Sequence, residues 1–386
     1  MNVTMVQNTK VIAGPGCSKD TGILLRESGY KKAFVVYDQG IKEAGLTESI
    51  LKGMDEQGIE YVCFDQVQAD PPAGVVEAAA AVCRDSQCDC VVAVGGGSSI
   101  DTAKGVTILR FNQGNILDYG KPETVMEPCS GLISIPTTAG TGSELSDGLI
   151  ITDTNRAVKV PILALNAMSE YAVIDPLLTL GVTRRTTAAT GLDVFSHAFE
   201  TYTSVKSNIM TEAIREKIME MVVENLPAVL ADPGDIKARS AMAAASTLAG
   251  WMLAQASAHA GHSVAHVLGA HFHIVHGEAC AYALPGVMEL NADTDRDKLI
   301  FVGRLLGAEF NDEDTDEQIG KKTADAYRDF RDHAVGLHSI KDYGEIEPGY
   351  INPICVDAVM NEPFLALAPK KVTRDDVLKL LNEAIS

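Results

Sequence analysis

The sequence predicts an α/β N-terminal half that contains a parallel sheet, followed by an all-α C-terminal half. Two patterns support this fold class. Up to about residue 180, short apolar runs alternate with amphipathic stretches, as in consecutive βαβ units. From Thr183 onward, Ala, Leu, Met and Glu recur with helical period. We place the boundary within residues 175–181, which predicts two domains, 1–180 and 181–386, packed around a cleft.

The elements of the first half follow from local sequence. Apolar runs predict strands at residues 10–13, 33–37, 90–94 and 132–135. The period of residues 20–28 predicts a helix, and a second helix is expected to begin within residues 99–104, after a run of three glycines.

Composition limits the partners and the compartment. The chain has 386 residues and a formal charge of -20, so we expect neither nucleic acid nor an anionic membrane face as a partner. The first ten residues lack a basic start and apolar run, and the eight cysteines are scattered, which predicts a cytoplasmic protein with reduced thiols. Residues 240–277 carry no Asp, Glu, Lys or Arg, but their histidines indicate buried helices rather than a membrane span.

Two features of the first half indicate dinucleotide binding. Gly96, Gly97 and Ser98 follow an apolar strand, and such a turn lets the backbone and the next helix N-terminus approach a pyrophosphate. Asp38 ends the second predicted strand, 22 residues after Gly16, where a carboxylate can bind the ribose diol and repel a 2′-phosphate. That pattern favours NAD over NADP. The third glycine of the usual fingerprint is absent, and Asp38 alone is also compatible with an ordinary turn residue.

The histidines of the chain cluster in its second half. Six of the nine histidines fall within residues 259–276. His262 and His266 are four residues apart, as are Asp193 and His197, so each pair shares one helix face. With His276, these side chains predict a divalent metal site, and imidazole with one carboxylate suits Fe, Zn, Ni or Mn. The other histidines of the window are as compatible with roles in supporting the ligands, lining the pocket or structure as with metal binding: His259, His271 and His273.

At these motifs the chain resembles the iron-containing (group III) alcohol dehydrogenases, relatives of glycerol dehydrogenase and dehydroquinate synthase. The resemblance spans nearly the whole chain and rests on four motifs: VAVGGGSSIDTAKG (92–105), PTTAGTGSE (136–144), AATGLDVFSHAFE (188–200) and HSVAHVLGAHFHIVHG (262–277). It implies a Rossmann-like, dehydroquinate synthase-like first domain and a helical metal-binding, catalytic second domain.

The resemblance also implies roles for individual residues. The four metal ligands fall on Asp193, His197, His262 and His276, and His266 matches a histidine beside the nicotinamide that does not bind the metal. The residues that match the family's cofactor site are Asp38, Gly96, Gly97, Ser98, Asp101, Thr137, Thr138, Thr141, Ser143 and Lys159.

The chain departs from the family pattern at a few positions. Ser99 and Val275 stand where proline is common, and neither change removes a functional group. Trp251 and His259 occupy positions that are usually small in the family, which leaves open a substrate other than the simple alkanols of better-known members. Residues 368–371 replace the common Asn-Pro-Arg.

The expected reaction is reversible hydride transfer between a small primary alcohol, or its aldehyde, and NAD. Fe²⁺ is expected as the metal ion, with Zn²⁺ as the alternative, to act as a Lewis acid on the substrate oxygen while His266 relays a proton. Within the family, the alternatives are a reductase of a charged or hydroxylated aldehyde and a hydroxyacid–oxoacid transhydrogenase. A cyclising lyase and a non-enzymatic scaffold are the alternatives from other classes. A homodimer or larger homo-oligomer is expected from the resemblance.

Overall fold

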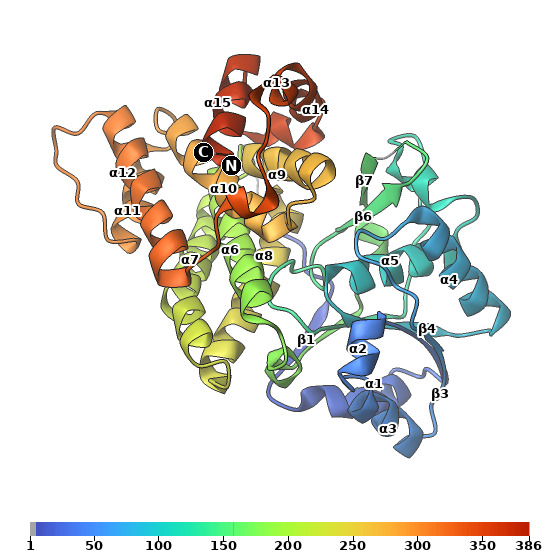
Figure 1. The fold of residues 1–386 in the computed structure, drawn as a ribbon. Helices are drawn as coiled ribbons and strands as arrows, with labels where there is room; N and C mark the ends of the chain where they lie inside the picture. Colours follow the sequence, from blue (N-terminus) through green and yellow to red (C-terminus); the bar gives the residue numbers. More distant parts are fainter. Residues whose placement is uncertain (1–4, 157, 386) are drawn as a thin grey trace. The chain divides into compact units, whose positions relative to one another are not determined.

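The computed structural model describes residues 5–156 and 158–385, which divide into a unit of residues Val6–Val182 and a unit formed by Met5 together with residues 183–385. The predicted fold class is confirmed: the first unit is α/β with a parallel sheet, and every regular element described from Thr183 onward is helical (Figure 1).

Six parallel strands form the sheet of the first unit, in the order β1-β8-β5-β4-β2-β3. Their bounds are β1 Lys10–Ala13, β2 Lys32–Val36, β3 Glu60–Phe64, β4 Cys90–Gly95, β5 Leu132–Pro136 and β8 Tyr171–Ile174. An antiparallel hairpin, β6 Gly148–Asp153 and β7 Val158–Leu163, stands apart from this sheet. The helices are α1 Thr21–Glu27, α2 Gln39–Glu43, α3 Glu48–Glu56, α4 Ala73–Asp85 and α5 Gly97–Phe111.

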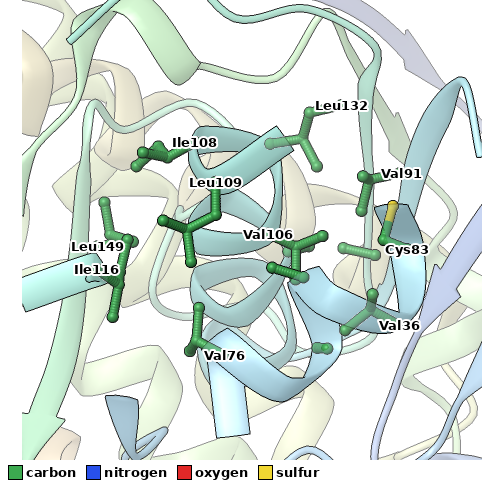
Figure 2. Close-up of a cluster of buried hydrophobic side chains, with 14 of the residues drawn as sticks. Val36, Val76, Cys83, Val91, Val106, Ile108, Leu109, Ile116, Leu132 and Leu149 are labelled. Atoms are coloured by element: carbon green, nitrogen blue, oxygen red, sulfur yellow. The ribbon is translucent and has the colours of Figure 1, made fainter. Parts of the chain in front are cut away.

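Both faces of the sheet are covered, which explains why its inner strands read as continuous apolar runs. Alternate side chains of β2 and β4, such as Phe34 and Val91, pack with α4 and α5 in the cluster shown in part in Figure 2. The intervening side chains, such as Val35 and Val92, pack in a second cluster with residues of α1 and α3. The central strands are therefore fixed in place by burial on two sides.

The helical unit is built from longer segments. The helices are α6 Arg184–Thr203, α7 Ile209–Ala231, α8 Ile236–Ala256, α9 Ala260–Phe272, α10 His276–Leu290, α11 Arg296–Leu305, α12 Asp316–Asp329, α13 Pro348–Tyr350, α14 Val356–Met360 and α15 Arg374–Ala384. Helix α10 packs against α6, α9, α12 and α15, and α6 also contacts α7, α8 and α9. Three helices that carry predicted site residues, α6, α9 and α10, are thus mutual neighbours.

One glycine sets the distance between α6 and α10. A Cβ atom on Gly277 would lie 2.2 Å from the carbonyl oxygen of Ala189, so no other residue fits this contact without moving a backbone. The close approach brings the first turn of α10, which contains His276, to the middle of α6, where Asp193 lies.

No helix among the described residues is both long and apolar enough to cross a bilayer.

Candidate functional site

Three imidazoles converge on one carboxylate in the helical unit. The Oδ1 atom of Asp193 lies 3.7 Å from Nε2 of His197, 3.7 Å from Nε2 of His262 and 3.8 Å from Nε2 of His276. The structure therefore places the three predicted histidine ligands around Asp193 Oδ1. The donor atoms that all lie within 4.8 Å of one another, however, belong to Asp193, His262, His276 and Cys280, and His197 is not in that group of described residues. They come from α6, α9 and α10, so the cluster depends on how these helices pack.

The donor set fits a divalent ion. In the described part of the chain, Asp193 Oδ1 and His262 Nε2 are buried and make no hydrogen bond. Buried polar atoms are normally satisfied, and a cation among them would supply the missing partner. Burial raises the pKa of Asp193, but His197, His276 and His262 outweigh it and hold the pKa below its usual value, so the carboxylate is charged.

Glu200 is a functional residue that sequence reasoning missed. It lies on α6, seven residues after Asp193 and three after His197, on the same helix face, and its side chain is fully buried. Its carboxylate accepts hydrogen bonds from the backbone N–H groups of His259 (3.1 Å), Gly261 (2.7 Å) and His262 (3.0 Å) at the start of α9. Glu200 thus caps α9 and fixes it against α6.

The same carboxylate orients the imidazole of His262. Nδ1 of His262 forms a very short hydrogen bond with Glu200 Oε2, which leaves Nε2 directed at Asp193. A carboxylate on the outer nitrogen of a metal-binding histidine is a common device for fixing its tautomer. Burial raises the pKa of Glu200, but His262, His259 and the Gly261 amide outweigh it and lower the pKa to about 2.

His266 lies beside this cluster with a carboxylate partner of its own. Its ring stacks on that of His276, with centroids 5.6 Å apart, and its Nδ1 is 3.1 Å from Oε2 of Glu362. Glu362 follows His266 by 96 residues, and no local pattern could have indicated it. Both side chains are partly exposed.

The remaining histidines of the window lie outside the cluster. His259 is fully buried, its Nε2 lies 2.9 Å from Thr203 Oγ1, and burial lowers its pKa. His271 contacts the hydroxyl of Tyr350 at 2.9 Å, and His273 ends α9 in a left-handed conformation, with φ of 55°. None of these three histidines belongs to the donor group found among the described residues.

A second buried carboxylate follows His276. Glu278 bonds the guanidinium of Arg185 (2.8 Å) and the hydroxyl of Tyr343 (2.6 Å). The Tyr343 hydroxyl in turn accepts the N–H of Val275 at 3.0 Å. Proline, which is common at position 275 in the family that the chain resembles, has no N–H to donate, so valine adds a hydrogen bond here.

In the first unit, the structure brings the two predicted loops together. Gly96 is the N-cap of α5 and Gly97 its first residue. A Cβ on Gly97 would lie 2.9 Å from Cγ2 of Thr141, and a Cβ on Gly96 would lie 3.3 Å from Oγ1 of Thr138. The threonine loop therefore lies against the glycine turn, and the free N–H groups of the α5 N-terminus are next to both.

The neighbouring loop residues are tied to the same turn. The N–H of Thr137 donates to the Gly95 carbonyl oxygen at 3.1 Å, and Ser98 lies in the first turn of α5. Ser143 is buried, and its N–H donates to Thr141 Oγ1 at 3.3 Å.

Three other predicted cofactor residues have partners within the protein. Asp38 follows β2 and caps α2, with its Oδ1 accepting the N–H of Ile41 at 3.0 Å. Asp101 is buried on α5 and accepts the N–H of Ile150, and burial raises its pKa to about 6. Lys159, on β7, pairs with Asp70 at 2.7 Å.

Taken together, a nucleotide-binding type of α/β unit and a carboxylate–imidazole cluster define a class, the metal-dependent dehydrogenases. Comparison with known proteins gives the family. Residues 8–176 match the model of the iron-containing alcohol dehydrogenases, and residues 187–385 match the model of the C-terminal part of the same family. The chain belongs to the iron-containing alcohol dehydrogenase family, and the predicted resemblance is confirmed.

Individual relatives agree with this assignment. The chain is 34% identical to the NAD-dependent methanol dehydrogenase of Bacillus methanolicus over 296 residues, 77% of this chain and 78% of that protein. It is 31% identical to the 1,3-propanediol dehydrogenase of Klebsiella pneumoniae over 373 residues, 96% of each chain. A solved sulfoacetaldehyde reductase from Bifidobacterium kashiwanohense, in complex with NAD⁺, is 26% identical and superposes with a TM-score of 0.88 over 100% of this chain and 99% of that one. The protein is thus an oxidoreductase of the class that acts on alcohols with NAD.

Proposed function

We propose that the chain catalyses reversible hydride transfer between a small primary alcohol, or its aldehyde, and NAD. The observation that carries this proposal is the convergence of three Nε2 atoms on Asp193 Oδ1 at 3.7–3.8 Å. Asp193, His197, His262 and His276 are the proposed ligands of an Fe²⁺ ion, with Zn²⁺ as the alternative. When bound, such an ion acts as a Lewis acid on the substrate oxygen.

The residues around the ligands have the following proposed roles. Glu200 holds Nδ1 of His262, so that its Nε2 faces the site. His266 moves the proton that the alcohol loses, and Glu362 at 3.1 Å fixes the ring on which that proton travels. Among the histidines that are not proposed ligands, only His266 is proposed to take part in catalysis.

The first unit is proposed to bind NAD, which accepts or returns the hydride. Gly96, Gly97 and Ser98 offer backbone N–H groups and the α5 N-terminus to the pyrophosphate. Asp38 is proposed to bind the adenosine ribose. The loop residues Thr137, Thr138, Thr141 and Ser143, with Asp101 and Lys159, are proposed to line the same cofactor. In this division, residues 1–180 bind the dinucleotide and residues 181–386 carry the metal and the catalytic histidine.

A cytoplasmic location and a homo-oligomer complete the proposal. Among the described residues, none of the eight cysteines forms a disulfide, as expected in a reducing compartment. Strand β1 is an edge of the parallel sheet, and it exposes Val11 and Ile12. An edge strand with apolar side chains can pair with a second copy of the chain, which supports a homodimer or a larger assembly.

An anaerobic aldehyde-reduction panel tests the substrate class. The enzyme is loaded with Fe²⁺, and NADH consumption is followed with short alkanals, hydroxyaldehydes and anionic aldehydes. Turnover with short alkanals supports the proposal. Turnover confined to anionic aldehydes replaces it with the activity that the sulfoacetaldehyde reductase suggests. Oxidation of an alcohol that requires an added oxoacid, with no release of NADH, replaces it with a transhydrogenase.

A further inference from the structure

We propose that Cys280 supplies a sulfur ligand to the metal ion held by Asp193, His262 and His276, and that this sulfur makes the site prefer thiophilic ions over Mn²⁺ and Mg²⁺. The inference rests on the proposed metal site. It adds a residue that is not among the four expected ligands.

The position of Cys280 follows from helical geometry. Cys280 lies four residues after His276 on α10, so both side chains share one face of that helix. The sulfur is 3.7 Å from Nε2 of His276. Helix α6 has the same four-residue spacing between Asp193 and His197.

The distances match those around one ion. The ligand atoms of Asp193, His262, His276 and Cys280 all lie within 4.8 Å of one another. Metal–sulfur and metal–nitrogen bonds of about 2.3 and 2.1 Å, with about 110° between them, place sulfur and nitrogen about 3.6 Å apart. The observed 3.7 Å between Cys280 and His276 agrees with that separation.

Burial supports a ligand at this point. The Cys280 side chain is 1% exposed, and it shares the cluster with Asp193 Oδ1 and His262 Nε2, which are buried and make no hydrogen bond in the described part of the chain. These two polar side chains are themselves 2% and 5% exposed. A cation bounded by the sulfur, the carboxylate and the imidazoles supplies a partner to these two atoms.

The chemistry of sulfur sets the expected selectivity. As the sulfur–metal bond forms, the thiol proton leaves to solvent and no electron is transferred. Thiolate is a soft ligand, which binds Zn²⁺, Co²⁺, Cd²⁺ and Fe²⁺ better than the oxygen-preferring Mn²⁺ and Mg²⁺. Replacing the sulfur by a hydroxyl should remove that preference and leave the carboxylate and imidazoles in place.

Cobalt spectroscopy tests the assignment without relying on turnover. The full chain is stripped of metal and reloaded with Co²⁺, and its absorption spectrum and cobalt content are measured. The wild type should bind one ion per chain and show a sulfur-to-cobalt charge-transfer band in the near ultraviolet. Cys280→Ser should bind cobalt without that band. Cys355→Ser, at a buried cysteine of the same unit that is not in the cluster, should keep it.

Two further measurements sharpen the result. In competition between Zn²⁺ and Mn²⁺, the ratio of the affinity for Zn²⁺ to that for Mn²⁺ should be at least about tenfold lower in Cys280→Ser than in the wild type. X-ray absorption of the wild-type cobalt enzyme should show a sulfur scatterer at about 2.3 Å, a test that holds even if the variants fail to fold. Stoichiometric cobalt with no sulfur scatterer and no charge-transfer band overturns the role of Cys280 and leaves the proposed metal site intact. A wild type that binds no cobalt overturns the metal site and the role of Cys280 together.

Discussion

Glu200 holds His262 at two points, because one carboxylate oxygen accepts both the backbone N–H and the imidazole Nδ1–H of this histidine. The other oxygen accepts the N–H groups of His259 and Gly261. The carboxylate thus ends one helix, joins it to another and sets the tautomer of a proposed ligand.

This relationship predicts that Glu200→Gln weakens metal binding. A glutamine amide has one oxygen to accept hydrogen bonds, so it cannot satisfy all four donors. We expect metal affinity to fall by about 10- to 100-fold, as is usual when the partner of a metal-binding histidine is lost. Metal retained after dialysis against a graded chelator measures the change. Glu220→Gln, on an exposed ion pair with Lys217, is the control; equal metal loss in both variants would contradict the role of Glu200.

Substitutions of His262 and His266 in α9 should have separate effects on metal binding and on the rate of turnover. His262→Ala should lose both metal and turnover, since it removes a proposed ligand. His266→Ala should keep its metal and lose about 100-fold or more in kcat, the usual effect of removing a general acid–base group. Metal content and steady-state kinetics on the same preparations check this. Full metal and activity in His262→Ala would show that the ligand assignment is wrong.

Removing the charge of Asp38 should change the preference between NAD and NADP while the cap of α2 is kept. Asn at this position can still accept the N–H of Ile41, which keeps the N-terminus of α2 capped. It no longer repels a 2′-phosphate, a contact worth on the order of 1 kcal/mol in solvent. Asp38→Asn should therefore raise kcat/KM for NADP relative to NAD by about fivefold to tenfold. An unchanged ratio would place Asp38 away from the ribose.

The glycine turn should tolerate no side chain. The Cβ atom that Gly97→Ala adds would lie 2.9 Å from Thr141 Cγ2, beside the proposed pyrophosphate site. We expect KM for NAD to rise by about tenfold or more while metal content is unchanged. Gly74→Ala is a matched control on α4, because no described atom beyond its chain neighbours and the nearby backbone of its own helix lies within 4 Å of the added Cβ. Equal NAD binding in both variants would argue against the turn as the pyrophosphate site.

Asp101 predicts a pH dependence of stability in the first unit. Burial raises its pKa from 3.8 to about 6, so the folded protein holds a proton that the unfolded chain releases. The stability due to this group is present below pH 3.8 and is lost as the pH rises through 6. The free energy of unfolding of the wild type should fall relative to that of Asp101→Asn between pH 4 and 7, by on the order of 2 to 3 kcal/mol. Denaturant titrations of both proteins measure the difference, and a constant difference would mean that Asp101 is not buried as described.

Much of the α/β unit could be predicted from local sequence, and the omission of β3 and of the β6–β7 hairpin has a physical cause. Strand β4 is buried on both faces, so it reads as an unbroken apolar run. Strand β3 and the β6–β7 hairpin have mixed exposure and give no such signal. No local segment of the sequence predicts the strand order, because parallel neighbours such as β5 and β8 are joined by long connections.

The sequence by itself determined the donor types and their local spacing: Asp193 with His197 and His262 with His266, each pair on one helix face, because helical period is a local property. Only the tertiary structure decided that these faces meet. The contact at Gly277 and the capping of α9 by Glu200 bring three helices to one point. Glu362 joins His266 for the same reason, since the two residues are 96 positions apart. Glu200 and Cys280 share a helix with a proposed ligand, but the contacts of Glu200 with the start of α9 also depend on how the helices pack.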